Sequence, residues 1–448
     1  MARVAQAIYP RPHPPTFTGV QRRALLGVLL VLGAVLSLAR TPRSQWNVLW
    51  AEDGTIFASG ALNDSWASLI APYSGYFHLV PRVAAFAVAW VPLEVLPVAI
   101  TFVAAVITAA LAVLCYIMLE SRIAAVPLRL AAWLVCIVLP TMGGEVPNNL
   151  ANLHWYLLIT AVCVLLTAST SRRIAIVQAI AIFAAITSDA LGLLLIPLFV
   201  VRWWLLPSGR DRGVVGAALA AGVVQACAVV GGLLGASDAR QIGQTHPSII
   251  EFGETYSIRV ALTGLTGVSG SQHAWSLLGQ AAGWSALLAV VALLVAAARV
   301  DRLRRWGIVL FFAGSLASAV VIYYVQWYAI ADAPTEAVLV GMRYAVVPAA
   351  LMMIAVLIAV DAFVARVPAT VSRRNLAGGV LALVLIPMLV DLRAATPRQD
   401  HWPWRSAIAH AREWCADQPN ADAVANLGAS PTWFGGMLVN CAVLKTHA

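Results

Sequence analysis

The sequence predicts an all-α polytopic membrane protein with about eleven transmembrane helices. Of its 448 residues, 61% are hydrophobic and only 11% are charged, and the mean hydropathy is +0.83. A soluble domain of this size could not bury so much apolar surface, so the chain must face lipid. Because lipid cannot form hydrogen bonds with the backbone, we expect the segments in the membrane to be helices, which satisfy the backbone polar groups internally.

Apolar segments recur along most of the chain and define the expected helices. Because they are spread in this way, the hydrophobicity does not come from a single anchor or a cleavable signal. The segments cover residues 25–38, 98–119, 130–140, 155–168, 174–187, 191–206, 214–234, 275–298, 306–328, 344–364 and 376–392.

Arginine clusters fall in every second gap between these segments and set the predicted orientation. Basic loops remain in the cytoplasm, so the N-terminus is expected there and the C-terminus outside. The chain then divides into a cytoplasmic leader (1–23), a transmembrane domain (24–394) and an extracytoplasmic tail (395–448). Prolines between residues 10 and 15 favour an extended leader. The clusters are Arg22-Arg23, Arg122 with Arg129, Arg172-Arg173, Arg210 with Arg212, Arg302-Arg304-Arg305 and Arg373-Arg374.

One apolar stretch, residues 78–92, would break this alternation if it crossed the membrane. It contains Pro81, Arg82 and Trp90, which suit a helix lying at the membrane surface better than a crossing helix. We therefore expect a juxtamembrane helix within a first extracytoplasmic loop of residues 40–97. The net charge of +9 is explained by topology, because the basic residues form no patch with interleaved aromatic residues that would bind nucleic acid.

The first outer loop carries adjacent carboxylates, Glu52 and Asp53, followed by Tyr76, His78 and Arg82. A carboxylate near a bond to be broken can take a proton from an attacking hydroxyl or hold a divalent cation. This composition indicates an active-site loop. The alternative is a solvated loop whose acids face water.

An acidic pair in the first outer loop, followed by a juxtamembrane helix with His and Pro, resembles the C-type (GT-C) glycosyltransferase superfamily. The resemblance implies a donor sugar on a polyprenyl phosphate and an acidic first-loop residue acting as base or metal ligand. Asp53 would be the catalytic base, with Glu52 as the alternative, because Gly54 leaves the backbone of Asp53 freest to be aimed. His78 and Arg82 fall where the superfamily has its His-Pro pattern, although the spacing here is His-Leu-Val-Pro.

The second outer loop is dense in polar side chains. Asn and His side chains there can bind sugar hydroxyls, and an aromatic ring can stack on a sugar face. The alternative is that the asparagines only cap helices. The candidate substrate-binding residues are Glu145, Asn149, Asn152, His154 and Trp155.

Two further polar positions lie beside apolar segments. Asp189 separates two of them and has no partner nearby in the sequence, and acids at membrane depth are usually functional. Arg343 and Tyr344 open a late segment from the outer side, in a position similar to the Arg-Tyr of several lipid-linked-sugar enzymes. A cation there could bind the donor phosphate; the alternative is an interface anchor.

The cysteines divide into two groups. Cys415 and Cys441 both lie in the outer tail, where an oxidising environment favours a disulfide. The others lie in apolar segments and are expected to be packing residues. The chain contains no CxxC, HExxH, Walker or GxGxxG pattern that would indicate zinc or nucleotide chemistry. The packing cysteines are Cys115, Cys136, Cys163 and Cys227.

Together these features predict a membrane glycosyltransferase of the bacterial inner membrane. It would transfer arabinose, mannose or a similar sugar from a polyprenyl-phosphate donor to a hydroxyl of a glycan, lipid or protein acceptor at the extracytoplasmic face. A divalent cation held by Glu52 and Asp53 is compatible with this reaction but not required. The alternatives are a lipid-linked glycan flippase or other transporter, and an O-antigen polymerase or ligase, whose key residues lie in large late loops.

Overall fold

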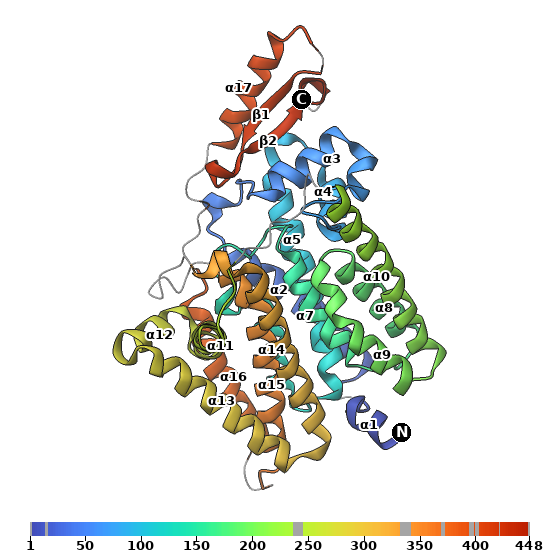
Figure 1. The fold of residues 1–448 in the computed structure, drawn as a ribbon, viewed down its shortest axis with the longest axis vertical. Helices are drawn as coiled ribbons and strands as arrows, with labels where there is room; N and C mark the ends of the chain where they lie inside the picture. The colour runs from blue at the N-terminus through green and yellow to red at the C-terminus, as the bar shows by residue number, and fades with distance from the viewer. Residues whose placement is uncertain are drawn as a thin grey trace.

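The computed structural model describes residues 2–13, 17–235, 245–331, 342–368, 372–393, 398, 403–420 and 422–446. Helices dominate these residues (Figure 1). Seven of the described helices are long and apolar enough to cross a membrane, which confirms a polytopic helical membrane protein. They are α2 (Gly19–Ala39), α5 (Leu96–Met118), α10 (Gly209–Gly235), α13 (Gln280–Val300), α14 (Arg302–Ala331), α15 (Val346–Val364) and α16 (Arg373–Val390).

The other predicted segments coincide with shorter helices. At 1.5 Å per residue, a helix of 10 to 15 residues extends about 15–22 Å, less than the roughly 30 Å of a hydrocarbon core. Helix length therefore does not show that all of the predicted segments cross the membrane completely. These helices are α6 (Val126–Val138), α7 (Leu153–Leu165), α8 (Arg172–Ile186) and α9 (Ile196–Leu205), the last preceded by a 3₁₀ helix (Ala190–Leu195).

Helix α15 forms the centre of the bundle. In its span, 89% of the residues are buried, against 22% for α2 and 11% for α16. It packs against α6, α7, α13 and α14, and its buried side chains are apolar except for Asp361 near its end, which pairs with Arg304. The outer helices instead direct their apolar side chains toward lipid.

The first outer loop is a compact helical layer. It contains a π-helix (Asp53–Ala58), α3 (Ser59–Asn63), a 3₁₀ helix (Ser65–Ile70) and α4 (Leu79–Val88). With ten residues, α4 extends about 15 Å, too short to cross a membrane. It packs on the π-helix and on α5, so the loop is tied to the bundle.

The region expected to be an outer loop before the segment 275–298 is largely helical. It holds α11 (Ile249–Tyr256), a π-helix (Ser257–Leu262) and α12 (Thr263–Leu278), and α13 begins only after Gly279, where φ is +55°. The helices were missed because Gly, Ser and Thr interrupt the apolar residues of this stretch. The capping box formed by Ser248 and Glu251 was a readable helix start.

The N-terminal leader also differs from the extended chain that was expected. Residues Ala2–Ile8 form helix α1, which contacts α9 and α14. A guanidinium nitrogen of Arg122 donates to the Ile8 carbonyl at 2.6 Å. The proline-rich stretch lies beyond this helix, and Pro14 and Pro15 fall outside the described residues.

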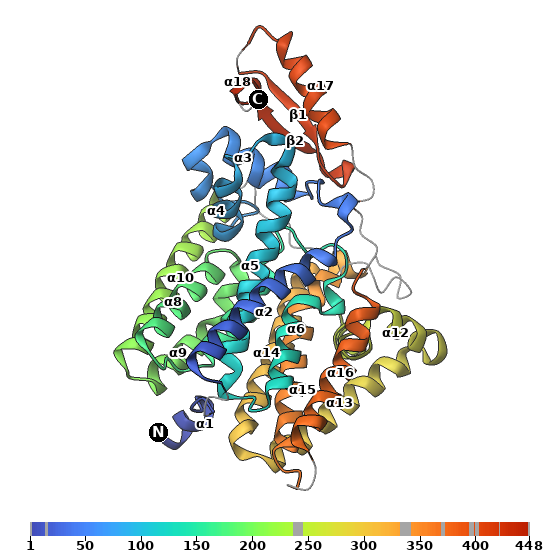
Figure 2. The same ribbon diagram turned by 180° about the vertical axis from the view of Figure 1, so that it is seen from behind.

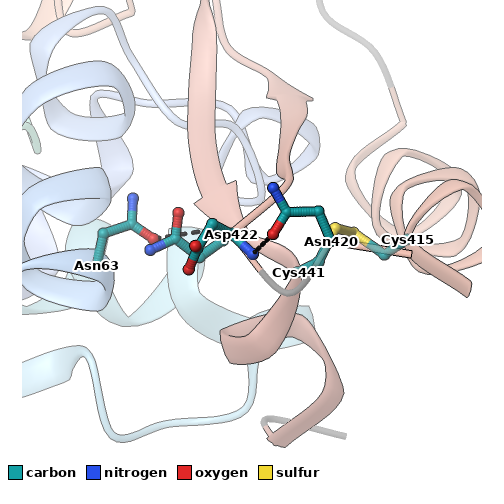
Figure 3. Close-up of a disulfide and its surroundings, with 6 residues drawn as sticks. Asn63, Cys415, Asn420, Asp422 and Cys441 are labelled. Carbon is teal, nitrogen blue, oxygen red and sulfur yellow. Dashed lines mark hydrogen bonds between the residues drawn. A yellow bond between two sulfur atoms is a disulfide. The ribbon is translucent and has the colours of Figure 1, made fainter. Parts of the chain in front are cut away.

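The tail forms a small cap at the opposite end of the molecule from α1 (Figures 1 and 2). Its helix α17 (Trp404–Ala416) packs on an antiparallel hairpin of β1 (Val424–Gly428) and β2 (Gly436–Asn440), followed by α18 (Cys441–Thr446). The hairpin was missed by an all-α prediction, although buried and exposed residues alternate along β1 as in a half-buried strand. Cys415 and Cys441 form a disulfide between α17 and α18 (Figure 3).

Candidate functional site

A cavity of about 680 Å³ lies where both outer loops meet the helical bundle. Residues 52–57 and 73–78 form one wall, residues 151–155 a second, and the turn at Asp189 a third. α10 and α14 close the remaining side. Most predicted site residues line it, namely Glu52, Tyr76, His78, Asn152, His154, Trp155, Asp189, Arg343 and Tyr344.

The adjacent carboxylates have different surroundings. Glu52 lines the cavity, whereas Asp53 is 1% exposed and is not among the described lining residues. Both oxygens of Asp53 accept backbone N–H groups, from Leu150 and Ala151, at 2.9 Å each. Asp53 therefore ties the first outer loop to the second, and of the two carboxylates Glu52 is the one at the cavity.

Burial changes the acidity of Asp53. It raises the pKa of this carboxyl to about 7, although the N–H groups of Ala151 and Leu150 and the positive charge of Arg398 oppose the shift. Arg398 is itself buried and donates to the Pro147 carbonyl at 3.0 Å. The sequence offered no reason to place this tail residue beneath the first loop.

The asparagines of the second loop mainly hold its shape. The Asn149 side chain accepts from the Asn152 backbone N–H at 2.7 Å and donates to the Glu145 carbonyl at 3.0 Å. The Asn152 amide accepts from the Trp155 indole at 3.0 Å. Asn149 does not line the described part of the cavity, so its predicted substrate contact does not fit. The capping alternative does not fit α7 (Leu153–Leu165) either, because its N-cap residue Asn152 makes no side-chain capping hydrogen bond.

His154 and Asp189 form a hydrogen-bonded pair inside the cavity. The His154 Nδ1 atom bonds one Asp189 oxygen, and the other oxygen accepts from the Leu191 N–H at 2.8 Å. Burial raises the pKa of Asp189, but His154 outweighs burial and the net shift is downward. The Trp155 ring lies 4.1 Å from the His154 ring. Asp189 therefore has a partner distant in the sequence.

Arg343 is the cation of the cavity. It pairs with Glu145, and its guanidinium donates to the Tyr344 hydroxyl at 2.9 Å and lies 4.9 Å from the Tyr344 ring. Glu52 is near enough for its charge to act on Arg343. Glu145 is not among the described lining residues, so it positions Arg343 and does not fit a direct substrate contact.

Of the aromatic and basic residues in the second half of the first outer loop, Tyr76 and His78 line the cavity and Arg82 does not. The Tyr76 and His78 rings lie 4.2 Å apart, and burial lowers the pKa of His78 to about 3, so this imidazole is neutral. Arg82 is 5% exposed, and its guanidinium carbon lies 5.7 Å from the centre of the Phe57 ring. Phe57 itself lines the cavity. Arg82 is absent from the described lining, so its predicted role as a substrate ligand does not fit.

The opposite side of the cavity is mostly apolar, apart from Gln326 of α14, and was not predicted. Its residues come from the 3₁₀ helix before α9, from α10 and from α14. Within apolar helices, nothing in the sequence distinguishes a residue that faces a cavity from one that faces lipid. They include Leu191, Leu194, Val229, Val321, Ile322 and Val325.

Among the residues that the structure describes, no group of three His, Cys, Asp or Glu side chains could hold a metal ion. Both Asp53 oxygens are occupied by N–H donors, so the site predicted for a cation at Glu52 and Asp53 does not fit. The sequence matches no model of a known protein family. No curated protein matches it either.

Proposed function

We propose that this protein is a membrane glycosyltransferase that uses a polyprenyl-phosphate sugar. The observation that carries the proposal is one cavity with a carboxylate and a cation, Glu52 and Arg343, facing an apolar wall. Such a donor has a hydrocarbon chain, an anionic phosphate and a polar sugar in sequence. Each part meets a matching surface in this cavity.

The positions of the apolar, cationic and aromatic residues define one orientation for the donor in the cavity. Its chain would lie against Val229 of α10 and Val325 of α14, helices whose outer surfaces face lipid. Arg343 would bind the phosphate through charge-assisted hydrogen bonds. His154 uses Nδ1 to bind Asp189, which leaves Nε2 for the sugar, and Trp155 supplies an aromatic face beside it.

The reaction would be a single displacement with inversion. The acceptor oxygen forms a bond to the anomeric carbon as the bond from that carbon to the phosphate oxygen breaks. The acceptor proton passes to the Glu52 carboxylate, and the electron pair leaves with the polyprenyl phosphate. Arg343 stabilises the charge that develops on this leaving group.

The proposed location is the extracytoplasmic face of a bacterial inner membrane. The chain ends lie at opposite ends of the molecule, and α14 and α16 both begin at the end where the N-terminus lies (Figure 1). The first residues of these helices carry the clusters Arg302-Arg304-Arg305 and Arg373-Arg374, which favours a cytoplasmic position for that end. A lipid-linked donor needs no nucleotide outside the cell.

The position of the cavity favours this enzyme over a polymerase or ligase. Those enzymes would place the site beneath a large late loop, whereas this cavity takes Glu52 and Tyr76 from the first outer loop and Asn152 and His154 from the second. If the protein moves the lipid-linked sugar across the membrane of proteoliposomes and forms no covalent product, a transporter is favoured instead.

The test is the substitution Glu52→Gln in protein reconstituted into nanodiscs. With polyprenyl-phosphate mannose or arabinose as donor, the wild-type protein should release polyprenyl phosphate and form a glycoside. Loss of the base should lower kcat at least about 100-fold, while thermal stability is unchanged. Glu413→Gln, on the exposed face of α17, is the matched control. Full activity of Glu52→Gln would exclude Glu52 as the base.

A further inference from the structure

A second cavity lies in the cap, outside the proposed active site. Its volume is about 580 Å³, and it opens between α17, β1 and the connection to β2. Its side chains include His410 and Trp414, one helical turn apart on α17, together with Asn426 of β1 and Thr432. None of these residues has a role in the proposed transfer.

The chemistry of this cavity points to an uncharged, partly polar ligand. Its described lining contains no Arg, Lys, Asp or Glu, so nothing there would select a phosphate or a cation. Trp414 is 45% exposed, so its indole ring is accessible to a ligand. An indole face with nearby amide, hydroxyl and imidazole groups suits the apolar ring face and hydroxyls of a sugar.

The floor of the cavity is shaped by Gly435 and Gly436. Gly435 has φ of +97°, and a Cβ there would meet no atom within 4 Å, so open space lies above it. A Cβ at Gly436 would lie 1.6 Å from Asn426 Oδ1, so the asparagine side chain rests directly on this glycine. The Asn426 amide is thereby held at the cavity edge.

The cap is joined to the loop that carries Glu52. Ser430 donates its N–H to the Leu49 carbonyl at 2.9 Å and accepts from the Ala51 N–H at 2.5 Å. Ala429, which lines the cap cavity, would lie 3.4 Å from a Cβ at Gly54. Asn63 donates to the Leu438 carbonyl at 2.8 Å and accepts from the Asn440 N–H at 2.9 Å. The cap cavity thus keeps a set position relative to Glu52.

We propose that the cap cavity binds a neutral saccharide chain, stacked on Trp414, as a distal part of the acceptor. Saccharide binding in the cap does not depend on the proposed function. The role of that saccharide as an acceptor does rest on the proposed function. A peptide is disfavoured because the lining lacks charged side chains to fix its termini or its polar side chains.

Binding is tested with the full chain in nanodiscs, which avoids detergents with sugar head groups. The probes are manno- and arabino-oligosaccharides, and their binding is measured by calorimetry and by saturation-transfer NMR. We expect Trp414→Ala to weaken binding about tenfold and His410→Ala, also exposed, to weaken it less. Trp90→Ala removes an indole that is 75% exposed outside the cap and should bind normally. No binding of either probe, or tighter binding of a neutral peptide, would overturn the proposal.

Transfer assays separate this inference from the proposed function. Trp414→Ala should raise KM for a long oligosaccharide acceptor about tenfold and leave both kcat and transfer to a monosaccharide acceptor unchanged. Glu52→Gln should lose transfer and keep oligosaccharide binding. If wild-type protein binds oligosaccharides without transferring sugar, the proposed function fails and the binding site stands. Equal KM values for long acceptors in Trp414→Ala and wild type would overturn the acceptor role.

Discussion

Glu52 and Asp53 illustrate how consecutive side chains of one type acquire different tasks. Ala51 has a positive φ of 38° and turns the chain just before the π-helix begins at Asp53. Asp53 then points to the N–H groups of Leu150 and Ala151, while Glu52 remains at the cavity. Their neighbours, and not their own chemistry, separate a structural acceptor from a candidate base.

This difference predicts distinct effects of amide substitutions. In Asp53→Asn, an NH₂ group replaces one of the two carboxylate oxygens. The backbone N–H of Leu150 or Ala151 that bonded this oxygen then faces a donor and has no acceptor. We expect a loss of about 1–3 kcal/mol in the free energy of unfolding, measured by denaturation in mixed micelles. Glu52→Gln should keep wild-type stability. Equal stability of Asp53→Asn and wild type would contradict the proposed link between the loops.

His78 predicts a pH dependence of stability. Burial lowers its pKa from 6.5 to about 3, so the unfolded chain binds the proton more readily than the folded one. Its contribution is complete above pH 6.5 and is lost as the pH falls toward 3. Between pH 6 and pH 4, the wild-type free energy of unfolding should fall by about 1.4 kcal/mol per pH unit more than that of His78→Phe. Parallel curves for the two proteins would refute this.

At the scale of elements, α12 owes its kink to a contact distant in the sequence. Gly267 has φ of +79°, and Asp391, after α16, accepts from the Val268 N–H at 2.5 Å and the Ser269 hydroxyl at 2.5 Å. The carboxylate thus replaces the helical hydrogen bonds that the kink interrupts. This joins α12 to the end of α16.

The substitution Gly267→Ala should therefore be costly. Its Cβ would lie 2.2 Å from an Asp391 oxygen, in a conformation that already disfavours a side chain. We expect a loss of about 2 kcal/mol or more, seen as a lower thermal unfolding temperature in detergent. Gly378→Ala is the control because a Cβ there meets nothing within 4 Å, and it should be neutral or stabilising. If both variants unfold alike, the kink is not fixed by this contact.

At the scale of the whole molecule, the cap stabilises the loop of the proposed site. The α17 residues Trp404 and Arg412 bind Leu93 and Glu94 at 2.7 and 2.8 Å, and Ser430 binds the chain before Glu52. The disulfide closes 26 residues of this cap. A local change in the cap should therefore reach the cavity while the bundle stays folded.

Removal of the disulfide tests this coupling. Cys441→Ser should destabilise the cap by about 3 kcal/mol, because the unfolded tail is no longer constrained by a closed loop. Proteolysis of the tail should accelerate and the proposed transfer activity should fall, whereas the helical circular dichroism signal should be unchanged. Cys227→Ser, an exposed free cysteine in α10, should alter none of these. Loss of helicity together with cap cleavage would show that the cap does not unfold separately.

The sequence by itself determined the membrane class and the positions of the main helices. These properties follow from local hydrophobic length, because each helix satisfies its backbone within its own segment. It also identified most of the polar residues that line the cavity, since polar groups between apolar segments are conspicuous. It did not reveal the cap hairpin or the helices between residues 249 and 278, where apolar and small residues alternate without a clear period.

Only the tertiary structure decided which polar residues face one another. His154 meets Asp189, Arg343 meets Glu145, and Asp53 turns away from the cavity, because helices distant in the sequence pack side by side. Such pairings depend on the rotation and depth of each helix, which are set by its neighbours. Hydrophobic length carries no information about them, and the apolar wall from α10 and α14 was hidden for the same reason.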